Sequence, residues 1–142
     1  MRTLVLTSVS LLVLAACGGG GSPTSGEALT PAQAEAMSVA DLGDRLVDDT
    51  AELGALLASI DSEADAEAAR PRIEAMVADY RVLEDRLNQL ENADLSFGDA
   101  AALMRRAPTL ASNARIIAVE VERLRKEHPE ASDLLGRILD DL

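Results

Sequence analysis

Apolar side chains recur at every third or fourth position through most of the chain from residue 38 onward. This spacing puts them on one side of an α-helix, and the alternation typical of a half-buried β-strand does not occur. The pattern predicts three long helices, over about residues 38–59, 63–91 and 98–127, and a short final helix over residues 130–142. We therefore expect an all-α protein.

Two of these helices carry a regular apolar stripe with spacings of three and four residues, as in coiled coils. Small Ala side chains at alternate positions of the third helix favour close approach of a neighbouring helix. The stripe of the second helix is Ile73, Met76, Tyr80, Leu83, Leu87 and Leu90. The stripe of the third helix is Leu103, Leu110, Ile117 and Leu124, with Ala107, Ala114 and Val121 between them.

Helix starts are marked by Ser or Thr followed three residues later by Asp or Gln, an arrangement that caps free backbone N–H groups. We expect Pro71 to kink the second helix or to mark its true start, because a proline inside a helix removes one backbone hydrogen bond. For the same reason Pro108 should kink the third helix or split off its first turns, and His128-Pro129 should end it. The four predicted caps are Thr30 with Gln33, Ser38 with Asp41, Ser62 with Asp65, and Ser96 with Asp99.

Each predicted helix has a single apolar side, so none of them is stable without the others. Three long helices joined by short turns predict an antiparallel three-helix bundle over residues 30–142, with the final helix as a short C-terminal fourth helix. In the first helix, Asp49 and Thr50 occupy positions at which the apolar stripe should continue. They are either a polar notch in the core or the point where the stripe drifts around the helix.

The first 17 residues differ from the rest: they hold one cation, Arg2, and a short apolar run that ends in Leu14-Ala15-Ala16-Cys17. A charged start, a short apolar core and small residues before the break are typical of a secretory signal peptide. The run is shorter than the ~20 residues that a membrane-spanning helix needs. The following residues, 18–27, are rich in Gly and Ser, which is typical of a flexible tether.

Leu14-Ala15-Ala16-Cys17 resembles the lipobox of bacterial lipoproteins. The resemblance implies that residues 1–16 are a signal peptide, that Cys17 receives acyl chains such as palmitate, and that residues 17–29 tether the bundle to a membrane. It implies the periplasmic side of the outer membrane rather than the inner membrane, because Gly18 replaces the Asp that commonly retains lipoproteins there. The segment from Ile60 to Ile73 resembles uncharacterised Ala-rich helical envelope proteins, which implies no activity.

The chain is acidic, with a formal net charge of −12 at pH 7. Such a charge argues against binding to nucleic acid and against direct electrostatic attraction to anionic lipids. It favours either a cationic partner or simply a well-solvated surface. Tyr80 and Phe97 are the only aromatic residues of the sequence, so stacking platforms for bases, sugars or haem are not expected.

Few residues suited to catalysis or metal binding occur in the sequence, which has one Cys, Cys17, and one His, His128. This excludes zinc and copper sites of the usual His/Cys kind and di-iron sites built on Glu-x-x-His pairs. His128 is expected to act as a cation at a helix C-terminus. The acids from Asp61 to Glu67 have no Gly among them and are expected to begin a helix rather than to hold calcium. We therefore expect no enzyme, no metal and no cofactor.

Other polar residues leave alternatives open. The basic groups at Arg105-Arg106 and within residues 123–126 either form ion pairs along the helix or present a patch to a partner. Asn113 lies beside the apolar stripe and is either a surface residue, which we favour, or a buried residue that fixes helix register.

Two functions of different class fit these observations. The first is a non-enzymatic module of the cell envelope, anchored to the membrane through Cys17, that binds an envelope protein or self-associates. The alternative is a periplasmic binder of a small ligand or cation, which would use the acidic surface or the notch at Asp49 and Thr50.

Overall fold

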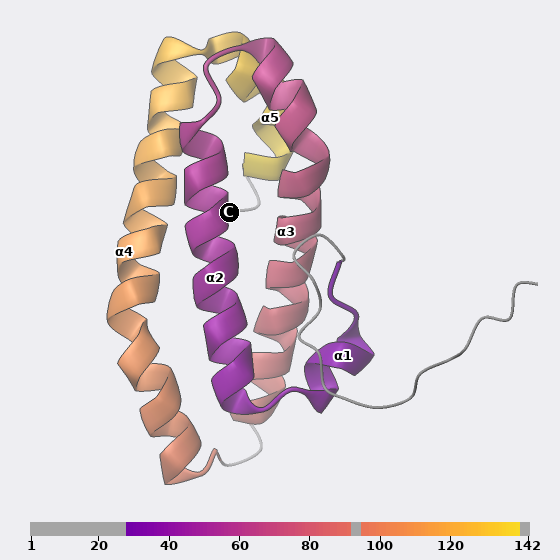
Figure 1. The fold of residues 1–142 in the computed structure, drawn as a ribbon, viewed down its shortest axis with the longest axis vertical. Helices are drawn as coiled ribbons and strands as arrows, with labels where there is room; N and C mark the ends of the chain where they lie inside the picture. The colour runs from indigo at the N-terminus through magenta and orange to yellow at the C-terminus, as the bar shows by residue number, and fades with distance from the viewer. Residues whose placement is uncertain (1–27, 92–94, 140–142) are drawn as a thin grey trace, which may run out of the picture.

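The computed structural model describes residues 28–91 and 95–139. These residues form five helices, and no strand occurs among them (Figure 1). The prediction of an all-α protein is therefore confirmed. The helices are α1 (Pro31–Ala36), α2 (Val39–Ala58), α3 (Glu63–Glu91), α4 (Phe97–Glu127) and α5 (Pro129–Leu139).

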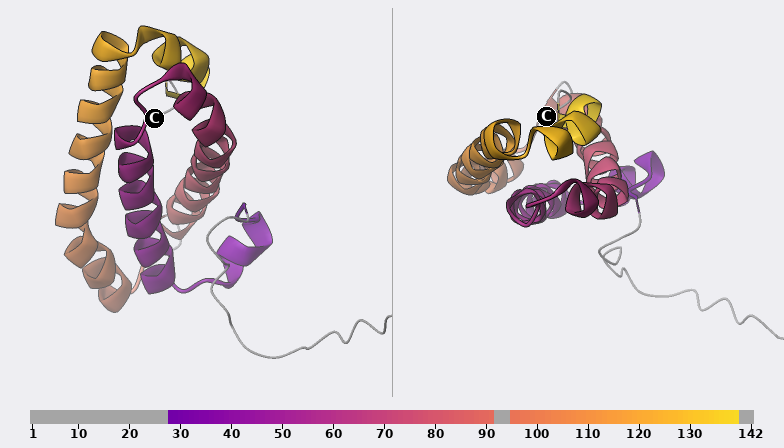
Figure 2. Two further views of the ribbon diagram at one scale, coloured as in Figure 1. Left: turned by 45° about the horizontal axis from the view of Figure 1, so that its top comes forward. Right: turned by 90° about the horizontal axis from the view of Figure 1, so that it is seen from above.

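The three long helices α2, α3 and α4 lie side by side, and successive helices run in opposite directions (Figure 1). Helix α2 packs against both α3 and α4. The short helix α5 folds back from the end of α4 and packs against both α3 and α4, on the side away from α2 (Figure 2). Helix α1 packs on α3 near the opposite end of the molecule.

The helix starts follow the predicted capping pattern. The hydroxyl of Ser38 accepts a hydrogen bond from the backbone N–H of Asp41 at 3.1 Å, and Ser62 and Ser96 accept equivalent bonds at 3.2 Å. Thr30 and Gln33 cap each other reciprocally at the start of α1. His128 caps the C-terminus of α4 through its backbone N–H. All five boundary assignments made from the sequence are confirmed.

Neither proline breaks its helix. Helix α3 begins at Glu63, before Pro71, and α4 runs continuously from Phe97 through Pro108. The interpretations that Pro71 marks the start of its helix and that Pro108 splits off the first turns of α4 are therefore wrong. Tertiary contacts offset the lost backbone bonds: Ala66 and Ala69 are buried before Pro71. Before Pro108, Ala102 is buried and Arg106 bonds to Asp44 of α2 at 2.6 Å.

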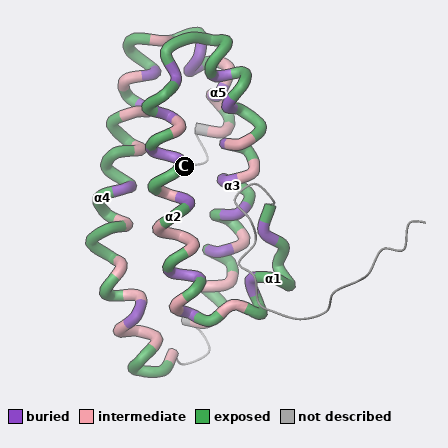
Figure 3. Tube along the Cα trace, in the orientation of Figure 1, coloured by how far each residue is buried: buried purple, intermediate pink, exposed green. Residues whose placement is uncertain are grey.

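The apolar core is divided into two clusters along the length of the molecule (Figure 3). The larger one lies where α5 joins the long helices and includes residues of α2, α3, α4 and α5. The second lies at the α1 end. Its described members are Leu29, Ala34, Leu42 and Leu83, with Met37, Leu46, Val82, Leu87 and Leu90 packed around them. None of these described residues belongs to α4, so this end of α4 contributes little to the core.

Helix α2 approaches α4 closely because two of its glycines face that helix. A Cβ atom on Gly54 would lie 3.1 Å from Cγ2 of Ile116, and one on Gly43 would lie 2.7 Å from Cδ of Arg106. The missing side chains make room for Leu103 and Arg106 of α4 at Gly43 and for Ile116 and Ile117 at Gly54, so the two backbones can come together.

Candidate functional site

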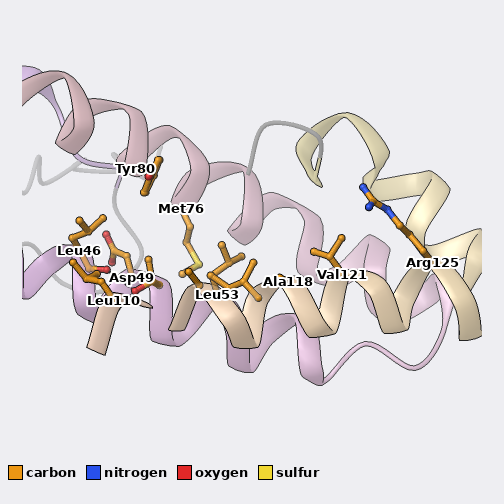
Figure 4. Close-up of a pocket in the computed structure, with 12 residues that line it drawn as sticks. Leu46, Asp49, Leu53, Met76, Tyr80, Leu110, Ala118, Val121 and Arg125 are labelled. Carbon is orange, nitrogen blue, oxygen red and sulfur yellow. Dashed lines mark hydrogen bonds between the residues drawn. The ribbon is translucent and has the colours of Figure 1, made fainter. Parts of the chain in front are cut away.

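An apolar groove lies between α3 and α4, with α2 beneath it (Figure 4). Its cavity volume is about 450 Å³. Helix α5 lies between the same two helices at one end of the molecule and does not extend along the whole of α4 (Figure 1). The apolar residues that line the groove are Leu46, Leu53, Met76, Leu110, Ala114, Ile117, Ala118 and Val121.

The polar groups of the groove lie toward its two ends. Asp49 and Tyr80 lie at the end farther from α5, and Arg125 lies at the end nearer to α5 (Figure 4). The middle of the groove is apolar. The site therefore offers apolar contact over most of its length, with a carboxylate at one end and a guanidinium at the other.

Asp49 belongs to a buried ionic cluster that joins α2 to α3. Arg45 donates from Nε to Oδ2 of Asp49 at 2.8 Å and from Nη2 to Oδ2 of Asp79 at 2.6 Å. The other oxygen of Asp79, Oδ1, accepts the backbone N–H of Leu29 at 2.6 Å. One guanidinium is thus shared by two carboxylates, which leaves one formal negative charge in the cluster.

Burial raises the pKa of Asp49, although the hydrogen bond and charge of Arg45 oppose this effect. The nearby negative charge of Asp79 also raises it. Among the described residues, Arg45 is the hydrogen-bond partner of Oδ2 of Asp49, and none reaches its Oδ1. One oxygen of this largely buried carboxylate is therefore bonded by Arg45, and the other is left for a group in the groove.

Asp49 and Thr50 form a polar notch in the core, which resolves the alternative left by the sequence. Asp49 is 8% exposed, and the hydroxyl of Thr50 donates to the carbonyls of Leu46 and Val47 of its own helix. The apolar stripe of α2 does not drift here: Leu46 and Leu53 line the groove on either side of the notch.

Asn113 of α4 completes this notch from the other helix. Its Nδ2 donates to the carbonyl of Val47 at 3.1 Å and to Oγ1 of Thr50 at 3.0 Å. Asn113 is only 8% exposed, so the interpretation that it lies on the surface is wrong. Its amide is buried because Gly54 and Thr50 let α4 come close enough for the side chain to reach the backbone of α2.

Two arginines of α4 also hold α2. Arg123 donates from Nε to Oε2 of Glu120 at 2.6 Å and from Nη2 to the carbonyls of Leu57 and Ile60 at 3.0 Å. Arg106 donates from Nε to Oδ1 of Asp44 at 2.6 Å. These basic residues therefore pair with α2 as well as along their own helix.

The acidic residues near the start of α3 act as helix caps. Asp65 accepts the hydroxyl of Ser62 at 2.7 Å and the backbone N–H of Asp61 at 3.3 Å. His128 lies near them, with Nε2 3.9 Å from Oδ1 of Asp61. Within residues 28–91 and 95–139 no group of His, Cys, Asp and Glu is arranged to hold a metal ion.

The structure and comparisons with known proteins also bear on membrane insertion, on the predicted lipidation site and on similarity to other proteins. In the described part of the chain, no helix is both long enough and apolar enough to cross a bilayer. Cys17, the predicted lipidation site, lies outside the described residues, as do the signal peptide and most of the tether. Comparisons of the chain with protein-family models, with curated proteins and with solved structures found no match.

The groove itself escaped the sequence analysis, although two signals for it were present. Gly43, Thr50 and Gly54 are separated by seven and four residues, which places three small side chains on one side of α2. Ala107, Ala111, Ala114 and Ala118 form a similar stripe on α4. The glycines mark the close contact of α2 with α4, and Ala114 and Ala118 of the second stripe line the groove beside it.

Proposed function

We propose that this protein is a non-enzymatic helical interaction module of the cell envelope, and that the groove between α3 and α4 is its binding site. The observation that carries the proposal is that α5 fills the space between these helices at one end only. At the other end the described core cluster draws on α1, α2 and α3 but not on α4. In this view the fold is an antiparallel three-helix bundle with α5 as a short fourth helix, and the groove is the unfilled part of the fourth position.

Exposed apolar residues support a binding role for α4. Phe97, Met104, Ile116 and Val119 are the large apolar residues of this helix that remain exposed, at 90%, 77%, 48% and 64%. Ile116 and Val119 are three residues apart and so present neighbouring apolar side chains on α4, which a partner that extends beyond the groove would cover. Partner binding and self-association would both use this helix.

The proposal includes a membrane anchor at Cys17. A lipidated Cys17 and the tether that follows it would hold the bundle at the periplasmic side of the outer membrane. Several acyl chains give a durable anchor, whereas one chain binds membranes weakly. Incorporation of an alkyne-labelled palmitate that is lost in Cys17→Ser would support this part, and equal labelling of the two chains would contradict it.

Photo-crosslinking in cells tests the binding role. A photoreactive residue would be placed at Ala118, which lines the groove, and for comparison at Ala78, an exposed residue of α3 that does not line the groove. We expect a defined envelope protein to be captured from Ala118 and not from Ala78, and to be captured less when Cys17→Ser removes the anchor. The same products from both positions would contradict a binding role for the groove.

A second candidate function is binding of a small amphiphile. The cavity volume of about 450 Å³ falls within the range of roughly 300–1,000 Å³ that is common for small-molecule sites. Its lining is mostly apolar with one carboxylate, which suits an alkyl chain with a cationic head better than a metal ion. Calorimetry with alkylammonium ligands tests this candidate, since heats that Asp49→Asn does not change would contradict it.

A further inference from the structure

We propose that the groove receives an amphipathic helix of a partner protein, and that a Lys or Arg of this helix pairs with Asp49. This inference rests on the proposed function, because it names the chemistry of the partner at the same site. Three features support it: helix α5, which already lies between α3 and α4; the small side chains on the wall formed by α4; and the charge of Asp49.

Helix α5 shows what kind of element fits between α3 and α4. It is amphipathic: Ala131 and Leu135 are buried, Leu134 and Ile138 pack against the same core cluster, and Asp133 and Arg137 are exposed. The groove lies along the same pair of helices, next to α5 (Figure 4). A second amphipathic helix in line with α5 would therefore repeat contacts that the protein already makes.

The length that remains open is suitable for a helix. On α4 the groove is lined from Leu110 to Arg125, and at 1.5 Å per residue these residues span about 24 Å, the length of a helix of about 16 residues. On the wall formed by α4, Ala114 and Ala118 are small, and small residues allow two helices to approach closely.

The charge at the Asp49 end of the groove, opposite the end lined by Arg125, selects the partner. Arg45 is shared between Asp49 and Asp79, and Oδ1 of Asp49 receives no hydrogen bond from the described residues. The whole chain carries a formal charge of −12. A cationic side chain that approached Asp49 from the groove would compensate the remaining negative charge, whereas an acidic side chain at that point would leave like charges buried together. A second copy of this acidic chain is a poorer match for the same reason.

The test uses the full chain reconstituted in phosphatidylcholine nanodiscs and fluorescein-labelled peptides of about 20 residues, which is long enough to span the groove. The peptides share one amphipathic helical sequence with a Leu and Ala stripe. They differ at a single central position of that stripe, which is Lys, norleucine or Glu. Affinity is measured by fluorescence anisotropy, with empty nanodiscs as the blank, against the unsubstituted chain and the variants Asp49→Asn, Asp48→Asn and Ala114→Trp.

We expect the Lys peptide to bind the unsubstituted chain about tenfold more tightly than the norleucine peptide, and the Glu peptide to bind most weakly. Asp49→Asn should remove the preference for Lys. Asp48→Asn makes the same change of charge at an exposed neighbouring residue and should preserve the preference. Ala114→Trp should abolish binding of all three peptides, because the indole would fill the groove.

The outcomes separate the two proposals. If the peptides bind and Ala114→Trp blocks them, but Lys, norleucine and Glu bind equally, the pairing with Asp49 is overturned and the groove remains a helix-binding site. If none of the peptides binds, or Ala114→Trp has no effect, helix binding in the groove is overturned as well. Dimers of the full chain that Ala114→Trp disrupts would show that a second copy occupies the groove and would also overturn the proposed partner. The comparison among peptides uses the unsubstituted chain, so it stands even if Asp49→Asn does not fold.

Discussion

Arg123 of α4 donates a hydrogen bond from Nη2 to the backbone carbonyl of Leu57, one of the last residues of α2. Carbonyls at the end of a helix have no partner within the helix, and a cation there also opposes the negative end of the helix dipole. Because the same guanidinium reaches Ile60 and pairs with Glu120, one side chain fixes the turn between α2 and α3 onto α4.

Replacing Arg123 by Met keeps the apolar stem and removes these bonds. We expect a loss of about 1–3 kcal/mol in the free energy of unfolding, since hydrogen bonds to charged groups are worth about this much. Urea unfolding followed by circular dichroism measures it. Lys126→Met is the matched control, because Lys126 pairs with Glu122 on the exposed side of the same helix. Equal unfolding midpoints for the two variants would contradict the role of Arg123.

The contact between Asn113 and Thr50 should be measurable as a coupling. Asn113→Ala is expected to destabilise the fold by about 1–2 kcal/mol, because it removes the buried amide that bonds the backbone of α2. In a double-mutant cycle with Thr50→Val, the interaction energy should be about 0.5–1 kcal/mol. A cycle of Asn113→Ala with Ser59→Ala, which share no partner, should be additive. Additivity in the first cycle would show that the observed contact carries no energy.

The contribution of Asp49 to the free energy of unfolding should change with pH in the opposite direction to that of Asp65, which caps α3. Burial raises the pKa of Asp49, so the folded state binds this proton more tightly than the unfolded state does. Its contribution to stability is therefore present at low pH and is lost as the pH rises through the folded-state pKa. For Asp65, the hydroxyl of Ser62 and nearby backbone N–H groups lower the pKa, so its contribution is lost as the pH falls.

Urea unfolding between pH 3 and pH 7 tests this contrast, using Asp49→Asn and Asp65→Asn, because carboxyl groups titrate from about pH 4 upward when burial raises their pKa. As the pH rises, the unsubstituted chain should lose stability relative to Asp49→Asn. Over the same range it should gain stability relative to Asp65→Asn. Parallel pH profiles for the two variants would rule out the proposed desolvation of Asp49.

Gly136 of α5 and Gly54 of α2 should respond differently to substitution by Ala. Nothing lies within 4 Å of a Cβ added to Gly136, so Gly136→Ala should stabilise the fold by about 0.5–1 kcal/mol through helix propensity alone. Gly54→Ala would bring its Cβ to 3.1 Å from Cγ2 of Ile116, so Ile116 or the helix backbone would have to shift by a few tenths of an ångström. We expect it to be at least about 1 kcal/mol less favourable than Gly136→Ala. Thermal unfolding of the pair decides this, and equal gains would mean that α2 and α4 are not closely packed.

The helices and their boundaries could be predicted from the sequence because both signals are local. The apolar periodicity of Ile73, Met76 and Leu83 and the capping serines act within a few residues of each other. Pro71 and Pro108 could not be interpreted in the same way. Their effect depends on whether neighbouring turns are buried, as Ala66 and Ala102 are, and burial is a tertiary property.

The site was less accessible to sequence reasoning for a related reason. Asp49 and Thr50 were recognised as exceptions in an apolar stripe, but their environment depends on Arg45, Asn113 and Asp79, which come from three helices. The groove depends on the length of α5, since a longer helix would have filled it. Neither property is visible in the periodicity of any one helix.

The bond between the backbone N–H of Leu29 and Asp79 has a mechanical consequence. Asp79 lies in the middle of α3, so a pull on the chain before Leu29 is applied to the flank of that helix and not to an end of the bundle. Leu29 and the six-residue helix α1 would detach first, and the larger core cluster would remain intact. We expect the groove to keep its shape when this entry segment detaches, because the residues that line it belong to α2, α3 and α4.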